Sequence, residues 1–202
     1  MHAGLMGLFI LFAGSCTPLR GPQSELAQFN AWVAAAPDRA ATFARFEAML
    51  EQADVAEVVP AHQLWLVDRL RPECVTAPYV VPAEEAWPNI VPALRFIRDH
   101  VKPAVGDVAV VSAYRDAAFN TCMRGAAQSA HRSFHALDLV PLNRALGREN
   151  LIALLCPIHA MAGARDGIGL GIYTGQRFHI DARSFRGWGP DYRRATFPCD
   201  GD

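Results

Sequence analysis

Apolar residues recur three or four positions apart in several separate stretches of the chain, which is the spacing of one helix face. The clearest stripe is Ile90, Leu94 and Ile97, and it is followed by Pro103 and Gly106, residue types that end helices. This reading predicts helices over residues 25–36, 39–52, 60–70, 87–100 and 148–162.

Short runs of β-branched and apolar residues lie between the later helices. They predict strands over residues 107–112, 136–140, 167–173 and 177–183. The third run contains glycines, which admit close approach of a neighbouring segment. The fourth run alternates, with Arg177, His179 and Asp181 on one face and Phe178 and Ile180 on the other. Helices around a few short strands, without regular alternation of the two, predict an α+β fold.

The amino terminus has a different pattern. Residues 5–13 form an unbroken apolar run that is too short to span a membrane, which needs about 20 apolar residues. Small residues and then Cys16 follow it, as in a bacterial lipoprotein signal, although no Lys or Arg precedes the run and Ala13 stands where Leu is usual. Either residues 1–15 are removed and Cys16 is lipidated as the first mature residue, or an ordinary signal peptide is cleaved nearby. We therefore expect export to the periplasm or cell envelope, with membrane contact only through this lipid.

The cysteines agree with an exported chain. With Cys16 used for lipid, an even number remains, which permits two disulfides in any of three connectivities. Their spacing is too wide for a structural zinc site, and buried free thiols would fit an oxidising compartment poorly. The disulfide candidates are Cys74, Cys122, Cys156 and Cys199.

The overall composition narrows the class of protein. Of the 202 residues, 51% are hydrophobic and 19% are charged, which is typical of a globular chain and argues against a disordered one. The formal net charge of −1 provides no bulk attraction to nucleic acid, because neutralising phosphates needs an excess of Lys and Arg. The length corresponds to one domain, and we expect a monomer with no nucleic-acid partner.

Ionisable residues inside the predicted strands provide the candidate chemistry. Asp138 lies in an otherwise apolar strand, where a carboxylate is costly to bury unless a cation or donors satisfy it. His179 lies in a similar position, and His131 lies in the loop before the strand of Asp138. Two imidazoles and one carboxylate are a ligand set suited to catalytic zinc, with water in the fourth position. Three other histidines are interpreted as ordinary packing or capping groups: His62, His100 and His159.

These residues belong to a longer series of polar segments. In order, the segments are Ser112-Ala113-Tyr114-Arg115, Asn120, Gly125-Ala126, Ser129-Ala130-His131, Ala136-Leu137-Asp138 and Phe178-His179-Ile180-Asp181. The series resembles the zinc D-alanyl-D-alanine carboxypeptidase-like family of cell-wall peptidases, which shares its fold with the hedgehog signalling domain. The family pattern is roughly Ser-Gly-Tyr-Arg, later Ser-x-His followed seven residues on by Asp, and later a strand bearing His. The match covers about residues 80–188.

The resemblance implies an architecture and a metal site. The architecture is a small, mainly antiparallel sheet flanked by helices over residues 80–202, preceded by an N-terminal helical segment over 16–79. The metal is one Zn²⁺ per chain, held by His131, Asp138 and His179.

The resemblance also implies a substrate pocket beside the metal. Arg115 would contact the substrate, because a planar guanidinium can hold a carboxylate or carbonyl near the scissile bond. Ser129 either shapes the same pocket or caps its loop. Tyr114 either lines the cleft or packs in the core.

The chain departs from the family pattern near the metal site. Phe134 and His135 stand where glycine and a basic or polar residue are usual, so Phe134 could narrow the pocket and His135 could add a polar contact. Gln176 and Arg177 occupy positions where several relatives carry the catalytic base, and neither can serve as one. Asp181 is then either the catalytic base or a residue that orients a ligand histidine or pairs with Arg183.

The function that the resemblance implies is zinc-dependent hydrolysis of peptide bonds at D-amino acids in peptidoglycan stem or cross-link peptides. The enzyme would be a D-Ala-D-Ala carboxypeptidase or an endopeptidase. One alternative is a zinc-containing peptidoglycan-binding protein with little or no turnover, because the usual base is missing. Another is an unrelated disulfide-linked secreted domain whose histidines are incidental.

Overall fold

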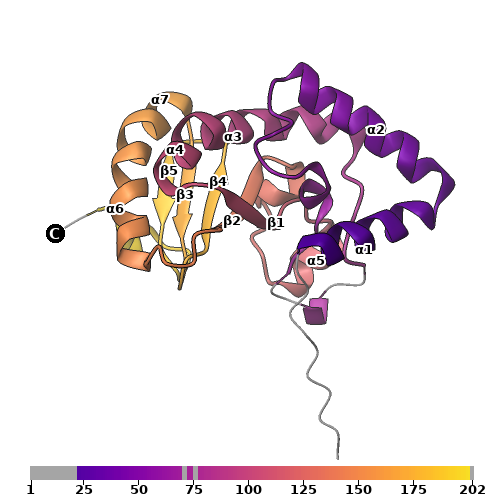
Figure 1. Ribbon diagram of the computed structural model, residues 1–202. Coiled ribbons are helices and arrows are strands. Elements are labelled where there is room, and N and C mark those ends of the chain that lie inside the picture. Colours follow the sequence, from indigo (N-terminus) through magenta and orange to yellow (C-terminus); the bar gives the residue numbers. More distant parts are fainter. Residues whose placement is uncertain (1–21, 70–71, 75–76, 201–202) are drawn as a thin grey trace, which may run out of the picture.

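The computed structural model describes residues 22–69, 72–74 and 77–200 (Figure 1). The predicted signal, residues 1–15, and the lipidation candidate Cys16 lie outside these ranges.

Two helices open the described chain, α1 (Pro22–Ala34) and α2 (Pro37–Gln52), as predicted. They pack through aromatic rings, and the ring centres of Phe29 and Phe43 are 4.6 Å apart. The Phe43 ring also lies 4.9 Å from the ring of Trp65, which follows later in the chain. The helix predicted over 60–70 was wrong beyond its first turn. Only a 3₁₀ turn, η1 (Ala61–Trp65), forms there, because the chain then runs extended and the Arg69 N–H donates to the Val111 carbonyl.

The helix predicted over 87–100 is longer and less regular than expected. It consists of the 3₁₀ segment η3 (Glu84–Ile90), α3 (Val91–Phe96), the π-turn η4 (Ile97–Val101) and α4 (Lys102–Val105). The π-turn ends two residues before Pro103, which has no N–H to continue an α-helical ladder. The helix predicted over 148–162 is likewise divided into α6 (Arg148–Ile158), the π-turn η6 (His159–Gly163) and α7 (Ala164–Asp166).

Shorter helical pieces lie in the loops. One of them, α5 (Ala117–Cys122), was not predicted, because the surrounding Gly, Ala and Ser residues indicated a loop. Its first turn is capped by Asp116, whose carboxylate accepts a hydrogen bond from the Phe119 N–H. The remaining 3₁₀ turns are η2 (Pro72–Cys74), η5 (Ala130–Ser133) and η7 (Arg194–Thr196).

In the described residues, five strands form one sheet in the order β1-β2-β4-β3-β5. The strands are β1 (Val108–Ser112), β2 (Ala136–Pro141), β3 (Gly169–Ile172), β4 (Phe178–Asp181) and β5 (Arg186–Trp188). Neighbours pair antiparallel except β3 and β5, which are parallel. The α+β class is thus confirmed, and β5 is a strand that the sequence reading missed.

The register of this sheet places its polar residues in one row. Directly paired residues point to the same face, so the row from β1 to β5 carries Ser112, Asp138, His179, Gly171 and Trp188 on one side. The alternate positions carry buried apolar side chains, among them Leu137, Leu139, Leu170, Ile172, Phe178 and Ile180.

The apolar face belongs to a core shared by the whole described chain. Residues from α2, α3 and α6 join the strand residues in one hydrophobic cluster, which includes Phe46, Leu94 and Leu151. Figure 1 shows α1 and α2 on one side of the molecule and α6 and α7 on the other, with α3 between them. The N-terminal helices therefore pack onto the same core as the sheet.

All four cysteines in the described chain are paired, as predicted, with the connectivity Cys74–Cys122 and Cys156–Cys199. Two disulfides indicate an oxidising, exported compartment. No helix in the described ranges combines the length and apolar character of a membrane span.

Candidate metal centre

Three buried side chains converge on the polar face of the sheet. His131 lies in η5, Asp138 in β2 and His179 in β4, and one ligand atom from each lies within 4.8 Å of the others. His179 Nδ1 is 2.9 Å from Asp138 Oδ1 and 3.1 Å from His131 Nε2. This is the group of residues that the sequence indicated as a metal site.

The hydrogen bonds around the two imidazoles determine which nitrogens face the centre. His131 Nδ1 lies 2.6 Å from the Ala113 carbonyl oxygen, which can only accept, so this nitrogen carries the proton. His179 Nε2 lies 3.0 Å from Asp181 Oδ2 and donates to that carboxylate. In the neutral rings, His131 Nε2 and His179 Nδ1 are then lone-pair acceptors facing each other and the carboxylate of Asp138. Three converging acceptors need a cation between them, so the donor set fits a metal ion.

The electrostatics of the cluster follow from burial and its partners. Burial, aided by Arg115, lowers the pKa of His131 to about 4, although Asp138 opposes this. Burial also acts to lower the pKa of His179, but its hydrogen bonds to Asp138 and Asp181 outweigh this and raise it. For Asp138, the cost of burial is outweighed by His131, His179 and Arg115, which keep its pKa well below the ordinary value. In the absence of a metal, His179 therefore favours its protonated form, and a metal ion that binds at Nδ1 would displace the proton there.

Two arginines hold the carboxylate of Asp138 from the other side. Arg115 donates to Oδ2 at 2.6 Å and to Ser112 Oγ at 3.1 Å, and Arg177 donates to the same Oδ2. Both guanidinium groups also lie 3.9 Å from the carboxylate of Asp68. Arg115, expected to contact substrate, thus contacts a candidate metal ligand while it also lines the cavity described below.

Asp181 lies on the side of His179 that faces away from the other two candidate ligands. Besides His179, its oxygens accept from both terminal nitrogens of Arg186, at 2.7 and 3.0 Å, and from the Arg183 backbone N–H at 3.0 Å. Burial acts to raise the pKa of Asp181, but the hydrogen bond from His179 and the charge of Arg186 lower it to about 2. This geometry favours the orienting role over the base, with Arg186 as the ion-pair partner where Arg183 had been considered.

Two glycines in β3 make room for these groups. A Cβ atom on Gly169 would lie 2.4 Å from the Asp181 carboxylate, and one on Gly171 would lie 2.5 Å from the Trp188 ring. The predicted use of glycine for close approach is therefore observed, and it serves the polar face of the sheet.

A cavity of about 810 Å³ opens above His131 and His179. Ser129 lines it and makes no side-chain cap to its own helix, which favours the pocket-shaping alternative. No Asp or Glu belongs to its lining in the described part of the chain. The charged and aromatic residues that line it are Arg115, Arg124, Arg186, Arg194, Tyr173, Trp188 and Tyr192.

Other expected contacts lie elsewhere. Tyr114 is not among the described lining residues and packs edge-on against Phe134, with ring centres 6.1 Å apart. Phe134 does not narrow the cavity, because its side chain is fully buried in the core and packs 6.1 Å from the Phe46 ring. Its φ of 56° is left-handed, which explains why glycine suits this position. His135 Nδ1 lies 3.0 Å from the Ser133 hydroxyl, and in the described chain the His135 imidazole makes no hydrogen bond or ion pair with the three candidate ligands.

Several residues around the site were missed or undervalued in the sequence. Arg177 was placed on the correct strand face, but its bond to Asp138 depends on the pairing of β2 with β4. Tyr173 follows β3 and lines the cavity together with Trp188. Burial, together with the charge of Asp138, raises the pKa of Tyr173, so the phenol stays neutral and can donate a hydrogen bond. No local motif marks these residues, since strands distant in sequence bring them together.

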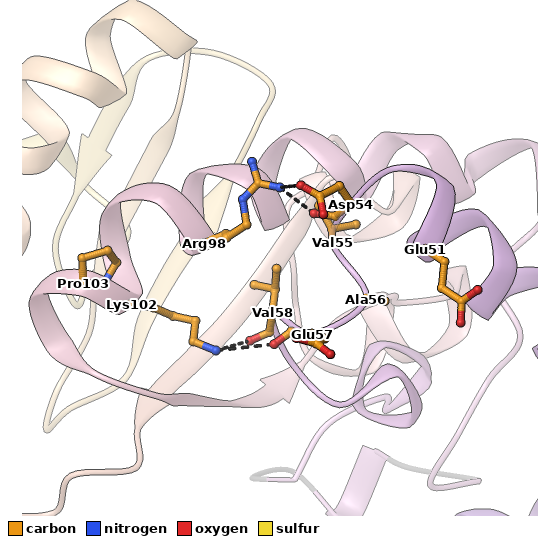
Figure 2. A pocket seen from close by; sticks show the side chains of 9 residues that line it. All are labelled: Glu51, Asp54, Val55, Ala56, Glu57, Val58, Arg98, Lys102 and Pro103. Atoms are coloured by element: carbon orange, nitrogen blue, oxygen red, sulfur yellow. Dashed lines mark hydrogen bonds and ion pairs between the residues drawn. The ribbon is translucent and has the colours of Figure 1, made fainter.

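A second hollow, of about 520 Å³, lies between the end of α2 and the helix that carries Arg98 and Lys102 (Figure 2). Its cations already have partners. Arg98 donates to the Asp54 carboxylate at 2.8 Å, and Lys102 donates to the Val58 carbonyl at 3.3 Å. None of the three candidate ligands lines it, so it is separate from the metal site.

Comparisons of the chain with protein-family models, with curated proteins and with solved structures gave no match.

Proposed function

We propose that the protein is a zinc-dependent peptidase that hydrolyses peptide bonds at D-amino acids in peptidoglycan stem or cross-link peptides. The observation that carries the proposal is the triad of His131, Asp138 and His179, with two imidazole lone pairs facing the centre beside an open cavity. The order and spacing of the motifs, which resemble those of the zinc carboxypeptidase-like family, supply the substrate class.

The residues around the metal site would have distinct roles in the reaction. Zinc, when bound, supplies a Lewis acid and a water of lowered pKa. Asp181 holds the His179 ring by its outer nitrogen, and Arg115 with Arg177 fixes the Asp138 carboxylate. Tyr173, a neutral phenol in the cavity wall, can donate a hydrogen bond to the oxygen on which charge develops.

A second candidate function is binding of the same peptides with little or no turnover. It is favoured by the cavity wall, which in the described residues contains no carboxylate to take a proton from water. Asp181 is already bonded to His179 and Arg186, so it is poorly available as that base.

The test is incubation of the purified, zinc-loaded protein with muropeptides, followed by mass spectrometry of the products. We expect loss of a terminal D-alanine or separation of cross-linked dimers, abolished by a chelator and restored by added zinc. The variant His131→Ala is the matched negative control. Binding without any product would select the second function, and absence of bound zinc would remove both.

Secretion to the cell envelope is part of the proposal. Two disulfides support an oxidising compartment, and the peptidoglycan substrate lies outside the cytoplasmic membrane. Lipidation of Cys16 would hold the protein at a membrane, and mass spectrometry of the mature protein tests it.

A further inference from the structure

The charges that line the cavity are of one sign. Four arginines reach its surface, and no acidic residue does so within the described ranges. Three of the arginines are paired: Arg115 with Asp138, Arg186 with Asp181 and Arg194 with Asp200. The fourth, Arg124, is exposed, and its guanidinium makes no hydrogen bond or ion pair with any residue that the structure describes.

Arg124 lies on a loop that is held in place. Its backbone is left-handed, with φ of 53°, and it follows Cys122, which is bonded to Cys74. The buried amide of Asn120 donates to the carbonyls of Gly125 at 3.3 Å and Ala126 at 3.2 Å. A Cβ atom on Gly125 would lie 2.4 Å from the Asn120 amide oxygen, so the loop and the amide fit closely. The loop backbone that carries Arg124 is therefore pre-organised, which lowers the entropy cost of binding a ligand there.

Aromatic side chains also line this cavity. The Tyr173 and Tyr192 rings lie 5.6 Å apart, and the Trp188 ring lies 5.0 Å from His179. Tyr192 is 72% exposed and has φ of 65°, an uncommon conformation for a residue other than glycine. Apolar ring faces and a free guanidinium suit a ligand with an apolar or peptide body and a negative group.

We infer that Arg124 binds a carboxylate of the ligand at the rim of the cavity, so that the site selects acidic peptides over neutral ones. This inference rests on the proposed function for the peptide nature of the ligand. A guanidinium holds a carboxylate by two parallel N–H···O bonds, and the three paired arginines are occupied by their own carboxylates. Arg124 is therefore the arginine of the described lining that is available for a ligand carboxylate without breaking an ion pair.

The test compares two probes by calorimetry with the full chain, after zinc is removed by a chelator so that no probe is cleaved. One probe is a pentapeptide ending in D-Ala-D-Ala with free carboxylates, and the other is the same peptide with its carboxylates amidated. We expect the acidic probe to bind about tenfold more tightly, because the charge-assisted pair is lost on amidation. Arg124→Gln should reduce this preference to about twofold or less and leave the affinity for the amidated probe unchanged.

Arg144→Gln is the matched control, because Arg144 is exposed, carries the same charge and does not line the cavity. It should leave both affinities unchanged. Equal binding of the two probes to the wild type, or an unchanged preference in Arg124→Gln, would overturn the inference.

A second measurement covers the case in which the chelated protein does not keep its fold. In the zinc-loaded protein, Arg124→Gln should raise KM for the acidic peptide about tenfold with kcat within twofold. Cleavage with an unchanged KM would overturn the role of Arg124 and leave the proposed function standing. Binding that depends on Arg124 but is not followed by cleavage would support the role of Arg124 and contradict the proposed peptidase function.

Discussion

The two faces of the sheet are built from the same strands, but one is a buried apolar surface and the other carries a network of charged and polar side chains. On one face Leu137, Leu170 and Ile180 pair across three strands, and each is at most 1% exposed. On the other face Asp138 and His179 pair in the neighbouring row and belong to a network of ion pairs and hydrogen bonds. A shift of one residue in the pairing of a strand would move every side chain of that strand to the opposite face, so the core and the metal site depend on the same register.

The two faces place different requirements on the residues at their positions. The apolar face needs side chains of suitable size, and many substitutions would preserve it. The polar face needs particular atoms at particular positions, together with glycines that leave room for Asp181 and Trp188. Changes on the polar face should therefore affect metal binding and chemistry, and changes on the apolar face should affect stability.

The largest expected effect is on the polar face. His179→Ala removes one of three candidate ligands, so zinc should fall from about one per chain to near zero, and any hydrolysis should fall about a thousandfold or more. Metal analysis by mass spectrometry and a muropeptide assay measure this. His100→Ala, which removes an imidazole outside the triad, should change neither quantity. Zinc retained by His179→Ala would contradict the metal site.

The next largest effect is expected on the stability of the fold, from a substitution on the apolar face of the sheet. Leu139→Ala removes a fully buried side chain from β2, next to Asp138, and should lower the free energy of unfolding by about 2–5 kcal/mol. Zinc content of the folded variant should be unchanged. Urea denaturation gives the stability, and Leu142→Ala, at a 57% exposed position, should change it by less than about 0.5 kcal/mol. Loss of zinc from folded Leu139→Ala would show that the two faces are not separable.

A smaller effect should come from the residue behind the ligand. Asp181→Ala removes the acceptor that orients His179, and should weaken zinc affinity by about 10–100-fold. Competition with a chromophoric chelator measures the affinity. Asp191→Ala, which removes an exposed carboxylate, is the control and should leave it unchanged. Abolished turnover with unchanged zinc affinity would instead identify Asp181 as the catalytic base.

The smallest effect concerns the wall of the cavity. Tyr173→Phe removes one hydroxyl and should lower kcat about tenfold with KM within twofold, because a donor to the developing charge is lost. Tyr192→Phe, on the exposed partner ring, should leave kcat within about twofold. Steady-state kinetics on one peptide separates the two variants. An unchanged kcat in Tyr173→Phe would remove this tyrosine from the proposed chemistry.

The sequence alone predicted the parts of the molecule that depend on local patterns. Periodicity located the main helices and four of the strands. The residue types of His131, Asp138 and His179, together with the resemblance to the zinc peptidase motifs, indicated the metal site. It missed β5, because that strand is three residues long, contains a glycine and pairs in parallel with a distant segment.

Other features depended on long-range contacts and could not be predicted from local pattern. Phe134 was considered as a pocket residue, yet it packs against Phe46 of α2, some ninety positions away in the chain. The bond between Arg177 and Asp138 likewise exists only once β2 and β4 are paired. Side-chain direction in a loop is set by partners that the local sequence does not contain.

The disulfides fasten the walls of the cavity, and neither cysteine pair lies within the sheet. Cys74–Cys122 holds the end of α5 beside the loop of Arg124, and Cys156–Cys199 ties α6 to the tail that follows Arg194. Reduction of both disulfides should lower the free energy of unfolding, by roughly 2–5 kcal/mol for each disulfide lost, and should also release both walls to a wider range of conformations. The disulfides therefore link the stability of the fold to the shape of the binding cavity, so the thiol–disulfide balance of the surroundings should affect both.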